Sequence, residues 1–476
     1  MSSAIEAAIR GAITTGMTKV ALFNRAHAKT AAAHPYLTGI HEPMAEEVTL
    51  EKLAVVGEIP VGLDGRYLRI GPNPVKMPNP ARYHWFTGDG MVHGVRLKGG
   101  EALWYRNRWV RTTHVSEVLG EAGRPGNRLR ESAVNTNVVG IGGKIFALVE
   151  AGGAPVELDG ELETVAHNAF GGTLTHAYSA HPHRDSETGE MHAICYHAFD
   201  LEHVFHVVVG RDGRVRREEP VAVNHGPSIH DCAITKQYVL VFDLPVTFSG
   251  QAMIAGYEFP YRWNENHVSR VGLLAREGNG ADILWCDVEP CYVYHPCNAF
   301  ERADGRVVVD VVVHNKNSHR DFRGPDGEVA RFERWVIDPV SRAVERRVVD
   351  ETAQEFPRMD ERRVGKDYRY AYTLCVAAGA ADTVGKTAIL KHDLVAGTRR
   401  IRDFGERRFP GEFVFVPRAE DSGEDEGWLM GLVVDMATET TELMILDAQD
   451  FEGEAVARVM LPHRVPPGFH GNFVPA

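Results

Sequence analysis

The chain has 476 residues, more than a single hydrophobic core usually holds, so it forms either two or three domains or one large modular fold. Hydrophobic residues make up 44% and charged residues 25% of the sequence, which is typical of an ordinary globular protein. The formal net charge of −13 argues against a nucleic-acid partner, because nucleic acids bind basic surfaces.

The N-terminal region has no sign of export. Residues 1–30 lack the continuous apolar segment and the cleavage site of a secretory signal. No apolar run in the chain reaches the roughly 18–20 residues that span a bilayer. Six cysteines fit a reduced compartment, and the spacing of Cys286, Cys291 and Cys297 matches no zinc template, so we interpret them as buried thiols. We therefore expect a cytoplasmic protein.

Residues 4–25 have the pattern of an amphipathic helix, and we treat residues 1–34 as an N-terminal helical extension. One face of this helix collects apolar side chains: Ile5, Ile9, Ile13, Met17 and Leu22. The helix either packs on the body of its own chain or lies on a membrane surface and collects an apolar substrate there. The weakly basic polar face favours the first alternative, and peripheral contact with the inner membrane surface stays open.

From about residue 50 onward the sequence predicts many short strands. Apolar β-rich runs are bounded by Gly, Asp, Pro or Asn, and Asp-Gly pairs mark hairpin turns at residues 212–213, 304–305 and 326–327. The clearest runs are residues 144–149, 204–209, 238–242, 306–314, 427–434 and 442–446. Only two further helices are expected, near 114–122 and 351–363. The acidic run 420–426 is best explained as a solvated hairpin tip.

This density of short strands predicts an all-β fold, either an array of sandwiches or a propeller. No Pro/Ser/Gly-rich linker divides the chain, and a propeller is one large modular unit, so it suits this length. We therefore expect residues 35–476 to form a single domain. No repeat motif is readable, so the number of blades does not follow from the strand pattern.

Four of the 23 histidines stand in unusual local settings. Each follows a small or apolar residue, precedes Pro, Asp or Gly, and sits at an expected strand end: His181, His230, His295 and His470. The last of these lies in an apolar, Gly-punctuated stretch, residues 468–476, that must be tied into the body of the protein. Their spacings of 49, 65 and 175 residues would place each histidine on a different blade, facing one axis.

Four neutral imidazoles on one axis suit iron, copper, nickel or zinc. A structural zinc site is usually closed and contains thiolates, whereas an octahedral iron(II) would keep two positions for oxygen and substrate. The alternative is four separate buried histidines, each with an ordinary hydrogen bond, which is the commoner situation.

Three glutamates stand in apolar settings where a lone charge would be costly: Glu150, Glu355 and Glu412. Metal-bound histidines need a partner for their other ring nitrogen, and a carboxylate often serves. The three glutamates could therefore orient three of the histidines. The alternative is a strand-edge glutamate on solvent in each case.

The sequence resembles the carotenoid cleavage oxygenases, a family with carotenoid-, apocarotenoid- and stilbene-cleaving members and a vertebrate retinoid isomerase. The resemblance runs from about residue 45 to the C-terminus. The motifs that carry it are residues 69–74, 83–93, 105–108, 135–137, 147–150, 180–182, 229–231, 294–296, 355–357, 415–417 and 468–471.

This resemblance implies a seven-bladed β-propeller capped by loops and short helices. It implies one iron(II) per chain, held by His181, His230, His295 and His470, with Glu150, Glu355 and Glu412 binding the ligands from behind. Thr136 matches a residue beside the open coordination site. The implied reaction adds both atoms of O2 across a conjugated C=C bond and gives two aldehyde or ketone products. The alternative from a different class is a propeller that serves as a non-catalytic binding scaffold.

The substrate is predicted from what is missing. Stilbene-cleaving members have a lysine just before the first glutamate and a nearby tyrosine, which together grip a phenol. Here the lysine position holds Val149, and Tyr105 is the candidate tyrosine. An apolar tunnel without the lysine favours a long polyene such as an apocarotenal, with a stilbene such as resveratrol as the alternative. Nothing in the sequence indicates an obligate protein partner.

Overall fold

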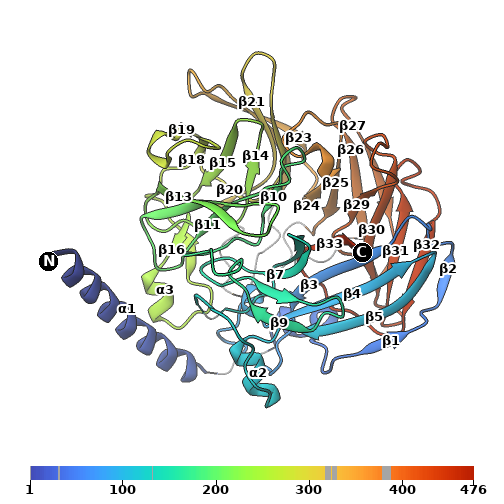
Figure 1. The fold of residues 1–476 in the computed structure, drawn as a ribbon, viewed down its shortest axis with the longest axis horizontal. Helices are drawn as coiled ribbons and strands as arrows, with labels where there is room; N and C mark the ends of the chain where they lie inside the picture. The colour runs from blue at the N-terminus through green and yellow to red at the C-terminus, as the bar shows by residue number, and fades with distance from the viewer. Residues whose placement is uncertain (1, 30–32, 131, 317–322, 324–329, 378–386) are drawn as a thin grey trace.

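The computed structural model describes residues 2–29, 33–130, 132–316, 323, 330–377 and 387–476, with residues 2–13 described by their backbone. Seven antiparallel sheets follow one another around a central axis and close into a ring (Figure 1). The fold is therefore the seven-bladed β-propeller that the resemblance implied. A short two-stranded ribbon, β16 (Val246–Phe248) and β17 (Tyr261–Trp263), is inserted in the fourth blade.

The strands of the first four blades follow in sheet order. Blade one is β1 (Thr49–Glu51), β5 (Glu101–Trp109), β4 (Gly90–Lys98), β3 (Gly65–Pro72) and β33 (Gly471–Pro475). Blade two is β6 (Asn137–Ile141), β7 (Lys144–Leu148), β8 (Val156–Leu158) and β9 (Thr164–His167). Blade three is β10 (His183–Arg184), β11 (Met191–Tyr196), β12 (His203–Val209) and β13 (Val215–Ala222). Blade four is β14 (Cys232–Ile234), β15 (Tyr238–Asp243), β18 (Arg270–Ala275) and β19 (Leu284–Asp287).

Three further blades complete the ring. Blade five is β20 (Tyr292–Glu301), β21 (Val307–His314), β22 (Arg331–Ile337) and β23 (Val344–Asp350). Blade six is β24 (Gln354–Arg358), β25 (Tyr370–Cys375), β26 (Ala388–Asp393) and β27 (Thr398–Asp403). Blade seven is β2 (Val55–Gly57), β32 (Ala457–Leu461), β31 (Thr440–Asp447), β30 (Gly427–Asp435), β28 (Arg408–Pro410) and β29 (Val414–Pro417). All six strands expected from the sequence are present.

Segments from both ends of the chain close the ring. Strand β33 pairs with β3 in blade one, with Gly471 opposite Arg69, while β2 pairs with β32 in blade seven. The innermost strands of neighbouring blades contact one another around the axis: β14 contacts β20, and β33 contacts β6. Central strands such as β21 are buried along their whole length, because each blade packs between two others. The chain therefore positions its axial residues from many separate segments.

Few helices lie outside the ring. Helix α2 (Thr113–Leu119) forms where the sequence predicted one, with the Thr112 hydroxyl accepting from the Val115 N–H at 3.2 Å. The prediction of a helix near 351–363 is wrong, because residues 354–358 form β24 and only Glu361–Arg363 make a short 3-10 turn. Pro357 cannot donate a helical hydrogen bond, and pairing with β25 satisfies the remaining backbone groups. The other short helices of the described residues are α3 (Gly250–Ile254) and the 3-10 turns Pro35–Leu37, Gly39–His41, Trp85–Thr87 and Gly280–Asp282.

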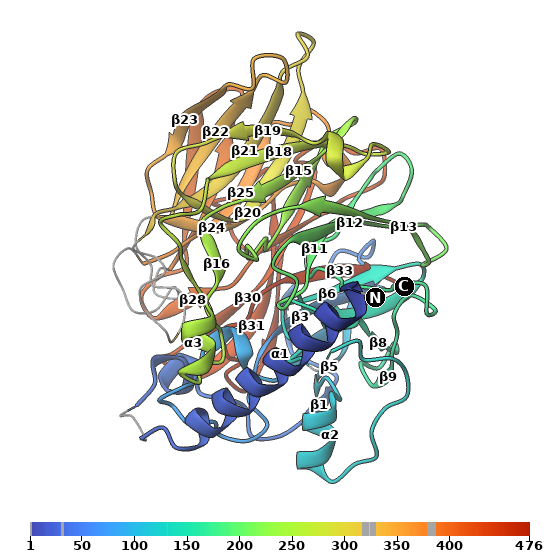
Figure 2. The ribbon, with the colours of Figure 1, turned by 90° about the vertical axis from the view of Figure 1, so that its left-hand side faces the viewer.

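Helix α1 (Ser2–Ala26) extends slightly beyond the predicted residues 4–25. It contacts α3 at the outside of the ring (Figure 2), and its N-terminal end points away from the ring (Figure 1). Asn24 Nδ2 donates to the Ile254 carbonyl at 2.6 Å, and Arg25 Nε donates to the Gly256 carbonyl at 3.2 Å. The side chains of Ile5, Ile9 and Ile13 lie outside the described residues. No helix in the described part of the chain is long and apolar enough to cross a membrane.

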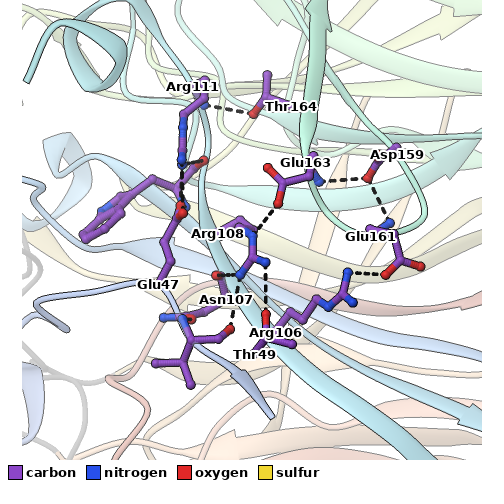
Figure 3. Close-up of polar contacts among 12 residues, drawn as sticks. Glu47, Thr49, Arg106, Asn107, Arg108, Arg111, Asp159, Glu161, Glu163 and Thr164 are labelled. Carbon is purple, nitrogen blue, oxygen red and sulfur yellow. Dashed lines mark hydrogen bonds and ion pairs between the residues drawn. The ribbon is translucent and has the colours of Figure 1, made fainter. Parts of the chain in front are cut away.

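The first two blades are tied together at their outer edge by a charged network (Figure 3). Arg106 pairs with Glu161, and Arg108 Nε lies 2.6 Å from Glu163 Oε1. The loop that carries both glutamates is itself held by Asp159, whose Oδ1 accepts from both their backbone N–H groups at 2.9 Å. Within the motif 105–108, Arg106 and Arg108 therefore contribute to the packing of blade one against blade two.

The cysteines are structural. All six are buried, which confirms the interpretation of Cys286, Cys291 and Cys297 as buried thiols. The acidic run 420–426 connects β29 to β30 as a hairpin loop, also as expected. The Asp-Gly turn predicted at 326–327 lies outside the described residues.

Candidate metal centre

The four histidines predicted as ligands come from four different blades and meet on the ring axis. His181, His230 and His470 stand just before β10, β14 and β33, as strand-end residues. His295 lies inside β20 instead, where the pairing with β21 shifts register between Val293 and Pro296. This bulge turns the His295 side chain toward the axis, because an irregular ladder re-aims the residue that it contains. The strand-end prediction therefore holds for three of the four.

The four imidazoles form one compact, buried cluster. One ring nitrogen from each lies within 4.8 Å of those of the other three. All four residues are less than a tenth exposed. His230 Nε2 lies 3.2 Å from His295 Nε2, and the His181 and His470 ring centroids are 4.5 Å apart. The cluster is too tight to be four independent core histidines.

Each of the three predicted glutamates binds one of these histidines from behind. Glu150 Oε2 lies 2.9 Å from His230 Nδ1. Glu355 Oε2 lies 2.6 Å from His295 Nδ1, and Glu412 Oε1 lies 3.0 Å from His470 Nδ1. A carboxylate accepts a hydrogen bond, so each of these histidines carries its proton on Nδ1. The Nε2 atom then has a free lone pair.

The resulting lone pairs face one another across the axis. Two unprotonated Nε2 atoms at 3.2 Å, those of His230 and His295, repel each other unless a cation lies between them. His181 Nε2 is buried and has no hydrogen-bond partner. A buried acceptor without a partner is costly, and a metal ion bound by the four rings would relieve it. The residues therefore fit a metal with affinity for neutral imidazole.

Electrostatics around Glu355 keep it charged. Burial would raise the pKa of Glu355, but His295 and His314 together hold that pKa well below its usual range. His314 was missed by sequence reasoning, and its Nε2 lies 2.6 Å from Glu355 Oε1. Its position at the end of a fully buried valine-rich strand was the available signal. One carboxylate thus joins a metal ligand to a second buried histidine.

Glu412 is held by a different set of groups. Arg358 Nη1 lies 3.3 Å from Glu412 Oε1, and the Gly471 N–H donates to Glu412 Oε2 at 2.8 Å. Burial raises the pKa of Glu412, yet Arg358 and His470 lower it to about 2 overall. Arg358 also donates to Asn472 Oδ1 at 2.8 Å. The C-terminal ligand is therefore fixed together with the strand that closes the ring.

His181 has no glutamate behind it. Its Nδ1 lies 3.7 Å from Asp231 Oδ2, while the other oxygen of Asp231 lies 2.7 Å from His183 Nε2. Burial and the neighbouring histidines lower the pKa of His181 well below its usual value. Asp231 was not predicted as a site residue. Its position directly after His230 was the signal that it lies near the axis. The His181 ring is thus held more loosely than the rings of His230, His295 and His470.

Three further predicted residues divide between two places. Thr136 and Val149 both line the cavity beside the cluster. The Thr136 hydroxyl donates to Asn135 Oδ1 at 3.0 Å, which leaves its methyl group as the part free of hydrogen bonding. Tyr105 lies elsewhere: it is buried in β5, and its hydroxyl pairs with His93 Nδ1 at 2.9 Å. Tyr105 is not among the residues that line the cavity.

A cavity of about 840 Å³ runs from the cluster to the surface beside α1. Its walls carry aromatic rings that sequence reasoning did not single out: Tyr83, Trp85, Phe86, Tyr196, Phe199, Phe248, Tyr257, Phe259, Tyr261, Tyr294, Phe356 and Phe469. Such a volume and lining suit one large apolar ligand. Only three-dimensional packing gathers these residues, since they come from segments spread over nearly 400 residues.

The chain is similar to known proteins along almost its whole length. A family model described as retinal pigment epithelial membrane protein matches residues 41–475. A protein of Mycobacterium tuberculosis named carotenoid cleavage oxygenase is 41% identical over 491 aligned residues, which cover 93% of this chain and 98% of that one.

Solved structures show the same similarity. Cobalt-substituted Synechocystis apocarotenoid oxygenase superposes with a TM-score of 0.80 at 28% identity, covering 91% of this chain and 97% of that one. The Pseudomonas brassicacearum lignostilbene dioxygenase superposes with a TM-score of 0.83 and covers 94% of this chain and 100% of that one. Its identity of 24% makes it a likeness of fold alone.

Proposed function

The chain belongs to the retinal pigment epithelial membrane protein family, the carotenoid cleavage oxygenases, and we propose that it cleaves one conjugated C=C bond of an apocarotenoid with O2. It is a dioxygenase of this family, and its products are two aldehydes or ketones. The single observation that carries this reading is the set of four converging imidazoles, three of them backed by carboxylates.

We propose iron(II) as the metal, one ion per chain. Iron(II) held by neutral ligands keeps its full positive charge and supplies O2 binding and activation, which zinc does not supply. His181, His230, His295 and His470 would hold it. Glu150, Glu355 and Glu412 keep three of these rings in the tautomer that offers Nε2. Thr136 presents a methyl group to the cavity and limits what can lie beside the metal.

The rest of the site holds and positions the substrate. The aromatic walls exclude water and grip an extended apolar chain, so that one double bond is held beside the metal. None of the chain's residues is required as a nucleophile or a base in this scheme. Val149 leaves the wall before Glu150 apolar, which supports a polyene over a phenol.

The test is turnover with defined substrates. Wild-type protein loaded with iron(II) should convert an apocarotenal into two carbonyl products that mass spectrometry identifies, with both oxygen atoms from labelled O2. His230→Ala should lose both metal and turnover. If His230→Ala kept its metal content and its activity, the proposed site would be wrong.

The alternative substrate is a stilbene such as resveratrol, and it belongs in the same assay. Cleavage of resveratrol in preference to the apocarotenal would replace the proposed substrate and leave the metal centre unchanged. The likeness to the lignostilbene enzyme concerns the fold, so it does not decide between them.

We also propose that the protein works in the cytoplasm and touches the inner membrane surface through the cavity mouth. Apolar side chains are exposed there: Val20, Leu22 and Phe23 on α1, Met77, and Ile254 on α3. Leu22 and Met77 also line the cavity, so a polyene could pass from lipid into it. Phe23→Glu should reduce co-sedimentation with vesicles of mixed anionic and neutral lipid. Equal sedimentation of wild type and Phe23→Glu would contradict this contact.

A further inference from the structure

Arg130, on the wall of the cavity, has no negatively charged partner among the described residues. Arg130 lies on the cavity, in the segment between α2 and β6. Its Nη1 donates to the Ala151 carbonyl at 3.2 Å, and its guanidinium carbon lies 4.6 Å from the centre of the Phe199 ring. Within the described part of the chain, these are the polar and ring contacts that its side chain makes, and no carboxylate forms an ion pair with it.

Several other charged groups that line the cavity have ionic partners, whereas Arg82 contacts an aromatic ring. Arg25 pairs with Glu258 at 3.5 Å, and Glu150 and Glu355 are engaged by histidines. Arg82 lies over the Tyr257 ring at 4.7 Å, near α3 and the cavity mouth. Burial lowers the pKa of Arg130, which agrees with a cation that lacks a compensating charge. An unpaired, partly buried guanidinium is costly, and its free N–H groups face a cavity built for a ligand.

The surroundings of Arg130 select a particular kind of ligand. Phe199, Tyr196 and Tyr261 stand beside it on the cavity wall and offer no negative charge at neutral pH. A ligand with an apolar conjugated body and an acidic end would satisfy the rings and the guanidinium together. A guanidinium binds a carboxylate through two parallel hydrogen bonds, and it binds an aldehyde or alcohol oxygen less strongly.

Resting on the proposed function, we propose that Arg130 recognises a carboxylate at one end of the substrate, so that the preferred substrate class is a conjugated polyene acid. The Arg130 guanidinium donates a hydrogen bond to the carbonyl of Ala151. Ala151 directly follows Glu150, and Glu150 contacts His230 Nδ1. Arg130 is therefore tied to the same short segment as the metal centre. A chain anchored there by its end presents one particular double bond to the metal. Arg130 thereby determines both end-group preference and cleavage position.

The experiment compares three polyenes of equal length that end in a carboxylate, an aldehyde or an alcohol. Binding is measured without oxygen on the iron-loaded protein by quenching of tryptophan fluorescence, since Trp85 lines the cavity. Arg130→Gln should weaken binding of the acid by about tenfold or more, because a hydrogen bond to a charged group is lost. Binding of the alcohol should change by less than about threefold. Arg130→Lys should restore part of the affinity for the acid.

Products in air give the second readout. Wild type should cut the acid at one position, whereas Arg130→Gln should give a mixture of chain lengths in mass spectrometry. Arg82→Gln is the matched variant, since it removes another cavity arginine that forms no ion pair with a carboxylate of the described residues. Two results would overturn the proposal: equal weakening of all three polyenes by Arg130→Gln, or loss of acid preference in Arg82→Gln instead. If wild type bound and cleaved none of the three, the proposed function itself would fail.

Discussion

The axis of the ring and the outer edge between blades one and two hold the same kinds of contact, carboxylates against nitrogen groups. At the axis, Glu355 and Glu412 are buried and each accepts two or more hydrogen bonds from fixed partners. At the edge, Glu161 and Glu163 are about half exposed and pair with arginines on β5 (Figure 3). Solvent screens the second set and is excluded from the first.

This difference teaches how much depends on each contact. A partner lost at the axis leaves a charge or a lone pair with no water to replace it, and the metal site changes with it. A partner lost at the edge is replaced by water, so the blades stay packed through their apolar cores. Geometry alone does not reveal this, because contact distances in the two regions are similar.

The largest effect should come from Glu355→Gln. The amide disturbs the hydrogen bonds to His295 and His314, so metal affinity should fall by about 10–100-fold. Competition with a coloured chelator measures this affinity. Glu163→Gln, the same change at the outer edge, is the matched control and should leave metal affinity unchanged. Equal metal affinity in the two variants would mean that the axis has no special role.

Arg358→Leu should come next. It leaves Glu412 buried without its cationic partner, and the free energy of unfolding should fall by about 2–3 kcal/mol, since the site is slightly open to solvent. Urea denaturation measures the change.

The pH dependence of Arg358→Leu sharpens this test. The pKa of Glu412 is lowered to about 2, so its stabilisation is present above the unfolded value of about 4.5 and is lost as pH falls toward 2. Without Arg358 that loss should become smaller. An unchanged acid dependence would show that Arg358 does not hold the Glu412 charge.

A third contact, inside blade three, joins two buried histidines. Its expected effect on stability lies between those at the axis and at the outer edge. His192 Nδ1 and His206 Nε2 lie 3.1 Å apart on β11 and β12, both buried. Burial lowers the pKa of His192 to about 3, and that of His206 well below its usual value. Both bind protons in the unfolded chain below about pH 6.5 but not in the folded one. Stability is therefore complete above pH 6.5 and falls as pH drops from 6.5 toward 3.

Each of these two histidines should contribute a slope of up to about 1.4 kcal/mol per pH unit in that window. In His206→Leu the dependence of unfolding free energy on pH, followed by urea titration between pH 4 and 7, should become less steep by about that amount. A slope equal to that of wild type would show that His206 is not held neutral.

The smallest effect should come from Glu161→Ala. The pair with Arg106 is half exposed, and such pairs contribute roughly 0–1 kcal/mol. Thermal denaturation should show a shift of no more than a degree or two, which disappears in high salt. A loss comparable to that of Arg358→Leu would remove the distinction between axis and edge.

Much of the site could be predicted from the sequence because its residues carry local signals. His181 and His230 sit at strand ends, and Glu150 and Glu412 interrupt apolar runs, which short windows reveal. His295 sits inside a strand, and only the register shift in β20 turns it inward. Arg358 has an ordinary local setting, so its role depends on which blades become neighbours.

The fold also divides into features with local sequence signals and features that depend on strand pairing. Strands with Asp-Gly turns were predictable from local chemistry, and the helix expected at 351–363 was not formed because pairing with β25 decided the conformation there. The apolar stretch 468–476 indicated that the C-terminal segment is tied into the body of the protein, but the strand that it pairs with, and the pairing of β2 with β32, have no local signature. Tyr105 shows the limit of matching by type: the residue is present, but it lies in the packing between blades and not on the cavity.

The pairing of β33 with β3 has a consequence for biosynthesis. His181, His230 and His295 leave the ribosome long before His470, whose strand must pair with residues 65–69 already made. A nascent or prematurely terminated chain can thus offer three imidazoles but never four. On the proposed metal site, tight metal binding therefore requires a chain whose translation has passed residue 470.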